Sequence, residues 1–218
     1  MPNFECQTCA ASFTVPQSAL DKYPGWTPKF CREHSPKKAA SAKRRSGSSG
    51  PKGGAKRTEE NLTVAEVLKK YTKGPKDGLF TDGSSVPNPG PGGWGAVWVR
   101  DGEVVEQRYG KSSHTTNNRM ELTALIEAFK LLPLDSQETV HTDSRLCVDT
   151  ITKWAPNWKK KGWKKKSGEI KNLELIQELL ELFEARPGAK IEWIAAHSGN
   201  RWNEYADSLA TAWMREKL

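Results

Sequence analysis

The chain has 218 residues and carries 34 Lys and Arg against 26 Asp and Glu, a formal net charge of +8. This length allows one domain of ordinary size plus a small module. No apolar run reaches membrane-spanning length and the N-terminus lacks a signal-type apolar segment, so we expect a cytoplasmic protein rather than a membrane or secreted one.

The positive charge is concentrated near the N-terminus. Residues 1–78 hold 15 basic and 7 acidic side chains, whereas residues 79–218 hold 19 of each. The N-terminal third therefore supplies the whole formal excess, which indicates a polyanionic partner such as nucleic acid.

Residues 1–34 contain two candidate chelating pairs, Cys6-x2-Cys9 and Cys31-x2-His34, separated by 21 residues. This spacing suits one tetrahedral Zn²⁺, which would replace a core that so short a segment cannot build. The segment also resembles a small zinc ribbon, although such ribbons often close with Cys where this chain has His34. The alternative is a set of free surface thiols, and the spacing favours zinc.

Residues 35–57 consist of Lys, Arg, Ser, Gly, Ala and Pro without a large apolar residue. Such a segment cannot bury enough surface to order itself, so we expect a flexible basic linker. Residues 58–76 are then predicted to form a short helix over 62–71 and a connector. Thr63 and Glu66 stand at capping-box spacing at the start of this helix.

The third region, residues 77–218, alternates between strand and helix patterns. Strands are expected at 79–84, 93–99, 104–110, 138–142 and 190–196, and helices at 117–132, 144–154, 172–185 and 203–216. Antiparallel strands followed by strand-helix alternation predict an α/β fold, a mixed sheet with helices on its faces.

Two of the predicted strands deliver a carboxylate to a strand end. Asp82 follows Leu-Phe-Thr and precedes a run of turn formers, and Asp143 ends the similar segment Thr-Val-His-Thr-Asp. If these strands are neighbours, the two acids lie side by side, which is costly unless a cation sits between them. The alternative is that each Asp only caps a turn.

Two further acids stand on helix faces that are otherwise inward-facing. Glu121 and Asp207 each share a helical stripe with mostly apolar residues. The companions are Leu125, Ala128 and Leu132 for the first, and Ala210, Thr211 and Met214 for the second. Four acids from two strands and two helices predict a metal site.

These segments resemble type 1 ribonuclease H over about residues 77–218, with every motif in family order. The motifs are Thr-Asp-Gly-Ser (81–84), Asn-Pro-Gly-Pro-Gly-Gly-Trp-Gly-Ala (88–96), Thr-Thr-Asn-Asn-Arg-Met-Glu-Leu (115–122), Thr-Asp-Ser (142–144) and His197 ten residues before Asp207. The resemblance implies a ribonuclease H-like mixed five-stranded sheet. It also implies endonucleolytic hydrolysis of the RNA strand of RNA/DNA hybrids, with 5′-phosphate and 3′-hydroxyl products.

The resemblance further implies two Mg²⁺ ions, with Mn²⁺ as a possible substitute. Asp82 would bridge both ions, and Asp143 would complete the site that activates the attacking water. Glu121 and Asp207 would hold the ion that faces the leaving 3′ oxygen. His197 would relay protons or assist product release, and the alternative for it is an ordinary surface histidine.

Substrate contacts are implied by the same resemblance. Asn88, Asn117 and Asn118 would lie near the sugar edge in the minor groove, and Thr116 near a DNA phosphate. Arg145 stands where this family usually has Gln, and because Arg donates without accepting, it would contact base edges or phosphate instead.

Residues 154–171 interleave tryptophans with lysines and resemble the basic protrusion of this family, which grips the DNA strand of a hybrid. The candidate contacts are Trp158, Lys159, Lys160, Lys161, Trp163 and Lys164. Trp154 and Trp158, four residues apart, are expected to pack into the local core. Cys147, at helical spacing with Ile151 and Trp154, is expected to be a core thiol.

One rival function is a DNA-cutting nuclease of the same fold, such as an integrase or resolvase, against which the Asn-Asn-Arg-Met setting of Glu121 and the Trp/Lys segment argue. The other is a catalytically silent hybrid binder, against which the four acids and His197 argue. The N-terminal module and linker are expected to anchor nucleic acid, and a protein-docking role is the alternative. We expect a monomer.

Overall fold

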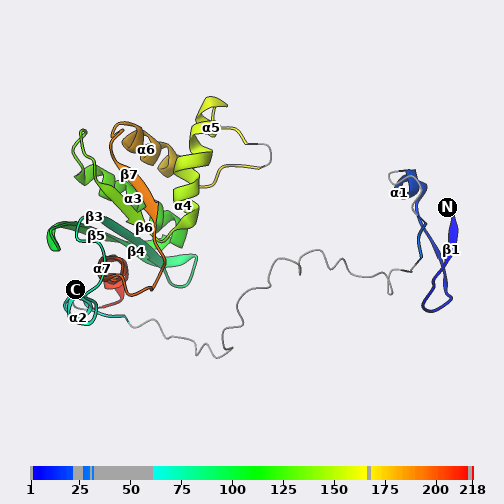
Figure 1. The fold of residues 1–218 in the computed structure, drawn as a ribbon, viewed down its shortest axis with the longest axis horizontal. Coiled ribbons are helices and arrows are strands. Elements are labelled where there is room, and N and C mark those ends of the chain that lie inside the picture. Colours follow the sequence, from blue (N-terminus) through cyan, green and yellow to red (C-terminus); the bar gives the residue numbers. More distant parts are fainter. Residues whose placement is uncertain (1, 22–26, 30, 32–60, 166–167, 216–217) are drawn as a thin grey trace. The chain divides into compact units, whose positions relative to one another are not determined.

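The computed structural model describes residues 2–21, 27–29, 31, 61–165, 168–215 and 218. The chain divides into two units, Met1–Lys56 and Arg57–Leu218 (Figure 1). None of the helices within the described ranges combines the length and the apolar character that crossing a membrane would require.

In the N-terminal unit, a short hairpin is followed by one helical turn. β1 (Asn3–Glu5) and β2 (Ser12–Thr14) pair in antiparallel register, and α1 spans Gln17–Asp21. Phe4 and Phe13 lie opposite each other in the hairpin, with ring centroids 6.0 Å apart. This hairpin holds Cys6 and Cys9 in the turn between its strands.

The second unit is built on a sheet of five strands in the order β5-β4-β3-β6-β7, which confirms the predicted mixed sheet. The strands are β3 (Gly78–Ser85), β4 (Gly90–Arg100), β5 (Glu103–Thr115), β6 (Thr139–Thr142) and β7 (Lys190–Trp193). The first three pair in antiparallel fashion, whereas β6 runs parallel to both β3 and β7. β3 is therefore the central strand, where antiparallel and parallel pairing meet.

β4 and β5 are longer than predicted, because their pairing continues past the apolar residues that mark them in the sequence. The turn between them lies where expected: Asp101 and Gly102 both have positive φ, 54° and 80°. Two successive positive φ angles are typical of a tight hairpin turn that matches strand twist.

Helices cover both faces of the sheet, and each face has its own core. α3 (Asn117–Leu131) and α6 (Leu173–Glu184) pack with Leu79 of β3 in one cluster. α2 (Val64–Lys70) and α7 (Arg201–Thr211) pack with Phe80 in the other. Successive residues of a strand point to opposite faces, so Leu79 and Phe80, both fully buried, divide between the two cores.

The sequence predicts that the helix after β6 ends at Trp154, but in the structure the helix continues to Lys160. α4 (Arg145–Asp149) passes into a π-helical turn, η1 (Thr150–Trp154), and then into α5 (Ala155–Lys160). Pro156 has no N–H to give to an α-helical bond, and the wider turn directly before it accommodates this gap.

The π-helical turn also explains why the prediction for Trp154 is wrong. Cys147 and Ile151 are buried as expected, but Trp154 is 40% exposed. A π turn takes more residues than an α turn, so Trp154 is rotated off the stripe on which Cys147 and Ile151 lie. Trp158, by contrast, does pack against the core.

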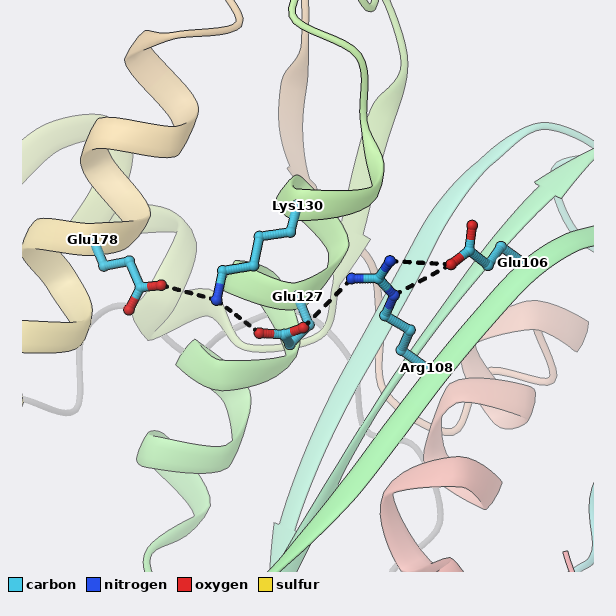
Figure 2. Close-up of polar contacts among 5 residues, drawn as sticks. All are labelled: Glu106, Arg108, Glu127, Lys130 and Glu178. Atoms are coloured by element: carbon cyan, nitrogen blue, oxygen red, sulfur yellow. Dashed lines mark hydrogen bonds and ion pairs between the residues drawn. The ribbon is translucent and has the colours of Figure 1, made fainter.

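A chain of ion pairs links the edge strand β5 to α3 and α6 (Figure 2). Arg108 lies 3.1 Å from Glu106 and 3.7 Å from Glu127, while Lys130 lies 2.9 Å from Glu127 and 3.0 Å from Glu178. Most of these side chains are well exposed, so each pair contributes about 1 kcal/mol at most. The network therefore links the surfaces of β5, α3 and α6 but adds little to the stability of the fold.

Candidate active site

Asp82 and Asp143 lie side by side because β3 and β6 are parallel neighbours. Thr81 pairs with Thr142, so the acids occupy the next position on each strand. A turn-capping role for each Asp alone would not require this register. The expected adjacency of the two carboxylates is thus present in the fold.

Glu121 joins them from the first turns of α3. A Cβ on Gly83 would lie 2.2 Å from the backbone nitrogen of Glu121, so only glycine lets the helix approach the strand this closely. One carboxylate oxygen from each of Asp82, Glu121 and Asp143 lies within 4.8 Å of the others. The stripe that carries Glu121 is apolar as predicted, with Leu125, Ala128 and Leu132 all buried.

Asp207 approaches the same cluster from α7. Its charge and a hydrogen bond with it are among the causes that raise the pKa of Asp82. The predicted stripe is correct at Ala210, which is fully buried, but fails at Met214, which is 41% exposed. α7 ends at Thr211 and passes into a 3₁₀ turn, η2 (Ala212–Met214), which changes the direction of the last side chain.

The cluster is electrostatically unfavourable without a cation. Burial, then the charge of Asp143, raises the pKa of Asp82 well above its usual range, and burial and then Asp82 do the same for Glu121. Burial also raises the pKa of Asp143. The Oε2 atom of Glu121 is buried and has no hydrogen-bond partner among the residues that the structure describes. These oxygens fit a divalent metal, for which carboxylates are the preferred ligands.

His197 occupies an exposed loop between β7 and α7, in a left-handed conformation with φ of 45°. Its Nδ1 lies 4.0 Å from Oε2 of Glu204. Burial raises the pKa of Asp143, and the hydrogen bond from Asn203 and then the charge of His197 offset part of that rise. The histidine therefore lies at the edge of the acidic cluster.

The prediction from sequence did not include Glu204, which the fold places in this site. It is buried, it accepts a hydrogen bond from the Gly199 N–H (3.2 Å), and it groups with His197 and Asp207 within 4.8 Å. The signal was available, because Glu204 precedes Asp207 by three residues and such a spacing puts both carboxylates on one helix face. Asn203 was also missed; it is 1% exposed and its Nδ2 donates to Asp143 at 3.5 Å.

Four of the predicted substrate residues gather at the N-terminus of α3. Asn88 Oδ1 accepts a hydrogen bond from the Asn117 N–H (3.3 Å), and Thr116 caps the helix by accepting from Arg119 N–H (3.3 Å). Asn118 Oδ1 accepts from the Cys147 thiol at 3.6 Å. Asn117 and Asn118 share α3 with Glu121, and Thr116 and Asn88 join them at its N-terminus, which places the group near the acidic cluster.

Arg145 is the first residue of α4, two residues after Asp143. Its guanidinium lies over the Trp193 ring, 5.4 Å from the centroid, and its side chain is 63% exposed. The indole N–H of Trp193 donates to the carbonyl of Asp143 at 2.9 Å. The exposed cation is thus tied through Trp193 to the strand end that carries Asp143.

In the expected basic protrusion, the lysines and the tryptophans have different roles. Trp158 and Trp163 are partly buried and pack against the core. Lys160, Lys161 and Lys164 are exposed, whereas Lys159 pairs with Glu184 at 2.6 Å. The lysines, together with Trp154, which is 40% exposed, are therefore the surface that this segment offers to a ligand.

In the N-terminal unit, the sulfur atoms of Cys6, Cys9 and Cys31 lie within 4.8 Å of one another. A hydrogen bond from the backbone at Cys31 lowers the pKa of Cys6 to about 6, which favours the thiolate that zinc binds, whereas the pKa of Cys9 is raised by its contacts with the Cys6 and Cys31 thiols. The fourth expected ligand, His34, lies outside the described residues.

Comparison with known proteins shows which family the sequence matches. Residues 76–215 match the family model for RNase H. The chain is 47% identical over 133 residues to Ribonuclease H of Agrobacterium fabrum, covering 61% of this chain and 90% of the relative. It is 43% identical over 143 residues to Ribonuclease H of Acidovorax sp., covering 64% and 95%. Among solved structures, it is similar to LC9-RNase H1, a type 1 RNase H with the type 2 active-site motif, at 32% identity and a TM-score of 0.52, covering 65% of this chain and 74% of that one.

Proposed function

This chain belongs to the ribonuclease H family, and on that premise we propose that it hydrolyses the RNA strand of RNA/DNA hybrids endonucleolytically. The products would carry a 5′-phosphate and a 3′-hydroxyl. The observation that carries the proposal is the convergence of Asp82, Glu121 and Asp143 within 4.8 Å, inside the matched domain. The rival reading as a DNA-cutting relative of the same fold is disfavoured by this family membership.

The acidic cluster is suited to hold two Mg²⁺ ions, with Mn²⁺ as a possible substitute. Asp82, at the centre of the cluster, would serve both ions, Asp143 the side of the attacking water, and Glu121 with Asp207 the side of the leaving 3′ oxygen. When bound, the ions would stabilise the charge that develops on the attacking and leaving oxygens. The Oε2 of Glu121, which has no partner among the described residues, supports this assignment, because a cation would stabilise the ionised form of a buried carboxylate.

His197 is suited to proton transfer at the same site. Glu204 faces its Nδ1 and would orient the ring, and the imidazole would take a proton from water or deliver one to the departing oxygen. Its exposed position also suits a role in product release. Asn203, which donates to Asp143, would keep that carboxylate oriented.

Selection of RNA depends on the 2′-hydroxyl, which both donates and accepts hydrogen bonds. Asn88, Asn117 and Asn118 carry amides that can do the same, and they gather beside Glu121. For the DNA strand, we assign phosphate contacts to Thr116 and to the exposed side chains of Lys160, Lys161 and Lys164. Arg145, at the start of α4, would reach phosphate or base edges. Contacts to phosphate give affinity without sequence choice.

The test of this function is a cleavage assay with one labelled strand in four contexts: RNA/DNA hybrid, single-stranded RNA, duplex RNA and duplex DNA. We expect magnesium-dependent cleavage of RNA in the hybrid alone, with 5′-phosphate ends. Binding without cleavage would support the silent binder, and cutting of duplex DNA would support an integrase-like or resolvase-like enzyme.

We also propose that residues 1–34 form a zinc-binding module, with Cys6, Cys9, Cys31 and His34 as ligands of one structural Zn²⁺. Residues 35–57 would be a basic linker and 58–76 a short helix and connector before the catalytic domain, 77–218. The grouping of the three cysteines supports the module. A cytoplasmic monomer remains our expectation for the whole chain.

The N-terminal module and linker would anchor nucleic acid and so raise the local concentration of hybrid at the catalytic domain. Deletion of residues 1–57 should then weaken hybrid affinity and flatten its salt dependence, while turnover changes little. If affinity and salt dependence are both unchanged, anchoring is wrong, and a protein-docking role becomes the better explanation.

A further inference from the structure

The segment 62–74 lies before the matched family region, which begins at residue 76, yet it packs on the helix that carries Asp207. Val67 of α2 is 2% exposed and belongs to the same core cluster as Trp202 and Leu209 of α7. The Ser208 hydroxyl donates to the carbonyl of Leu62 at 2.7 Å. α2 is therefore an integral part of the second unit.

The connector that follows α2 reaches the loop that carries His197. Lys73 and Asn200 form a parallel β-bridge, in which the Arg201 N–H donates to the Lys73 carbonyl at 2.7 Å. The Tyr71 ring lies 3.9 Å from where a Cβ on Gly199 would be. The connector thus contacts three successive residues at the end of the loop.

Gly74 lies so close to Asn200 that a side chain would not fit between them. It has φ of 148°, and a Cβ there would lie 2.7 Å from Oδ1 of Asn200. That oxygen caps α7, accepting from the N–H groups of Trp202 (3.1 Å) and Asn203 (3.4 Å). Because Gly74 has no side chain, the cap can occupy this space and the first turn of α7 is fixed against the connector.

The groups held in this way reach the proposed reaction centre. Immediately beyond the cap, Asn203 donates to Asp143 and Glu204 accepts from the Gly199 N–H. The side chains of Ala195 to Ser198 are exposed, and His197 and Gly199 both have positive φ. The loop is therefore held largely through its ends, and the connector braces one of them.

We infer that the segment 62–74 is a positioning element for the reaction: it fixes the loop of His197 and the start of α7, so that His197, Asn203 and Glu204 face the acidic cluster. The inference rests on the proposed hybrid hydrolysis. The predicted substrate contacts lie outside the segment 62–74 and the loop of His197, in the β3–β4 loop, around the start of α3, in α4, and in and after α5. A loosened connector should therefore slow turnover without weakening binding.

The test is Gly74→Ala in the full chain, with Gly102→Ala as the matched control. Both glycines have positive φ, so both substitutions strain the backbone, but a Cβ on Gly102 would meet no atom of the described part of the chain within 4 Å. We expect kcat for hybrid cleavage to fall roughly tenfold in Gly74→Ala while KM stays within about twofold, since small misplacements of reacting groups are costly. Gly102→Ala should keep the wild-type kcat.

A second substitution should restore the lost activity. Asn200→Ser keeps a capping hydroxyl but shortens the side chain that collides with the new methyl group, so Gly74→Ala with Asn200→Ser should recover most of kcat.

If Gly74→Ala proves too unstable to purify, the test is Tyr71→Ala. We expect its kcat to be several-fold lower than that of the wild type, and an unchanged kcat would overturn the inference. Equal kcat values for Gly74→Ala and Gly102→Ala would also overturn it. Failure of the proposed function would instead appear as absence of cleavage by the wild-type protein.

Discussion

At the scale of single residues, the buried carboxylates that the proposed reaction requires make the fold less stable. Asp82 is buried beside Asp143, and both its burial and its neighbours raise its pKa. An acid whose pKa is higher in the folded than in the unfolded protein makes folding less favourable as pH rises through that interval. The cost is greatest at neutral pH without metal, which is where a bound divalent cation would help most.

Asp82→Asn should therefore have opposite effects on stability and activity. In EDTA at neutral pH, we expect a higher Tm than wild type, because one buried repulsive charge is gone, and a smaller gain in Tm on adding Mg²⁺. Hybrid cleavage should be lost while hybrid affinity is retained. Thermal unfolding and gel-shift assays measure these effects, with Asp101→Asn, in the exposed β4–β5 turn, as control. A lower Tm for Asp82→Asn in EDTA would refute this account of the cluster.

Cys147 provides an independent test of burial. Desolvation raises the pKa of its thiol to about 12, and the residue is 1% exposed. Because the thiolate is the nucleophile, iodoacetamide at pH 8 should leave Cys147 unmodified in the native protein. Peptide mass spectrometry would locate the label, with denatured protein as the positive control. Labelling of native Cys147 as fast as in the denatured chain would contradict a buried thiol.

At the scale of elements, the joint between α3 and α6 depends on a buried cation. Arg186 is 7% exposed; its Nε donates to the Leu132 carbonyl and its Nη1 to the Leu182 carbonyl, both at 2.9 Å. Leu132 is the C-cap of α3, so the guanidinium satisfies a helix-end carbonyl that would otherwise be left unpaired in the core.

Arg186→Met should lower the free energy of unfolding by about 2–3 kcal/mol, because it leaves buried carbonyls without donors. Glu127→Gln, which interrupts the exposed ion-pair chain of Figure 2, should cost about 1 kcal/mol at most. Urea denaturation compares the two, and hybrid affinity should be unchanged in both. Equal costs would mean that the carbonyls find other partners when Arg186 is removed.

Elements with a strong local signal were predictable from the sequence. The capping box at Thr63 and Glu66 is present, and the helix that carries Glu121 begins at the predicted residue. The π-helical turn before Pro156 was not predictable, because a proline in a helical pattern ordinarily indicates an end. Its compensation depends on how the whole helix packs.

The candidate site was likewise predictable only where the sequence carries a local signal. Asp82 and Asp143 could be placed because their strands end in similar triplets. The spacing of Glu204 puts it on the helix face of Asp207, but its contact with the Gly199 N–H forms only when the loop folds back on α7 and has no sequence signal. The brace from residues 71–74 to that loop is a tertiary contact between segments about 125 residues apart, and nothing in the local pattern indicates it.

At the scale of the whole molecule, the proposed division of labour follows the charge. The catalytic domain has balanced charge and carries the acidic cluster, while the N-terminal region supplies the positive excess. Cleavage should therefore depend on the metal and on the four acids, and affinity should depend on salt and on the N-terminal region.

The most direct test of the central claim is single-turnover cleavage of a 5′-labelled RNA/DNA hybrid by wild type, Asp82→Asn and Asp101→Asn, each with Mg²⁺ or with EDTA. We predict rapid cleavage of the RNA strand by wild type and Asp101→Asn in Mg²⁺, and none by Asp82→Asn or by any of the three in EDTA. Cleavage by Asp82→Asn at the wild-type rate, or an intact hybrid after incubation with wild type in Mg²⁺, would contradict the claim that these carboxylates and the divalent ions they hold perform the reaction.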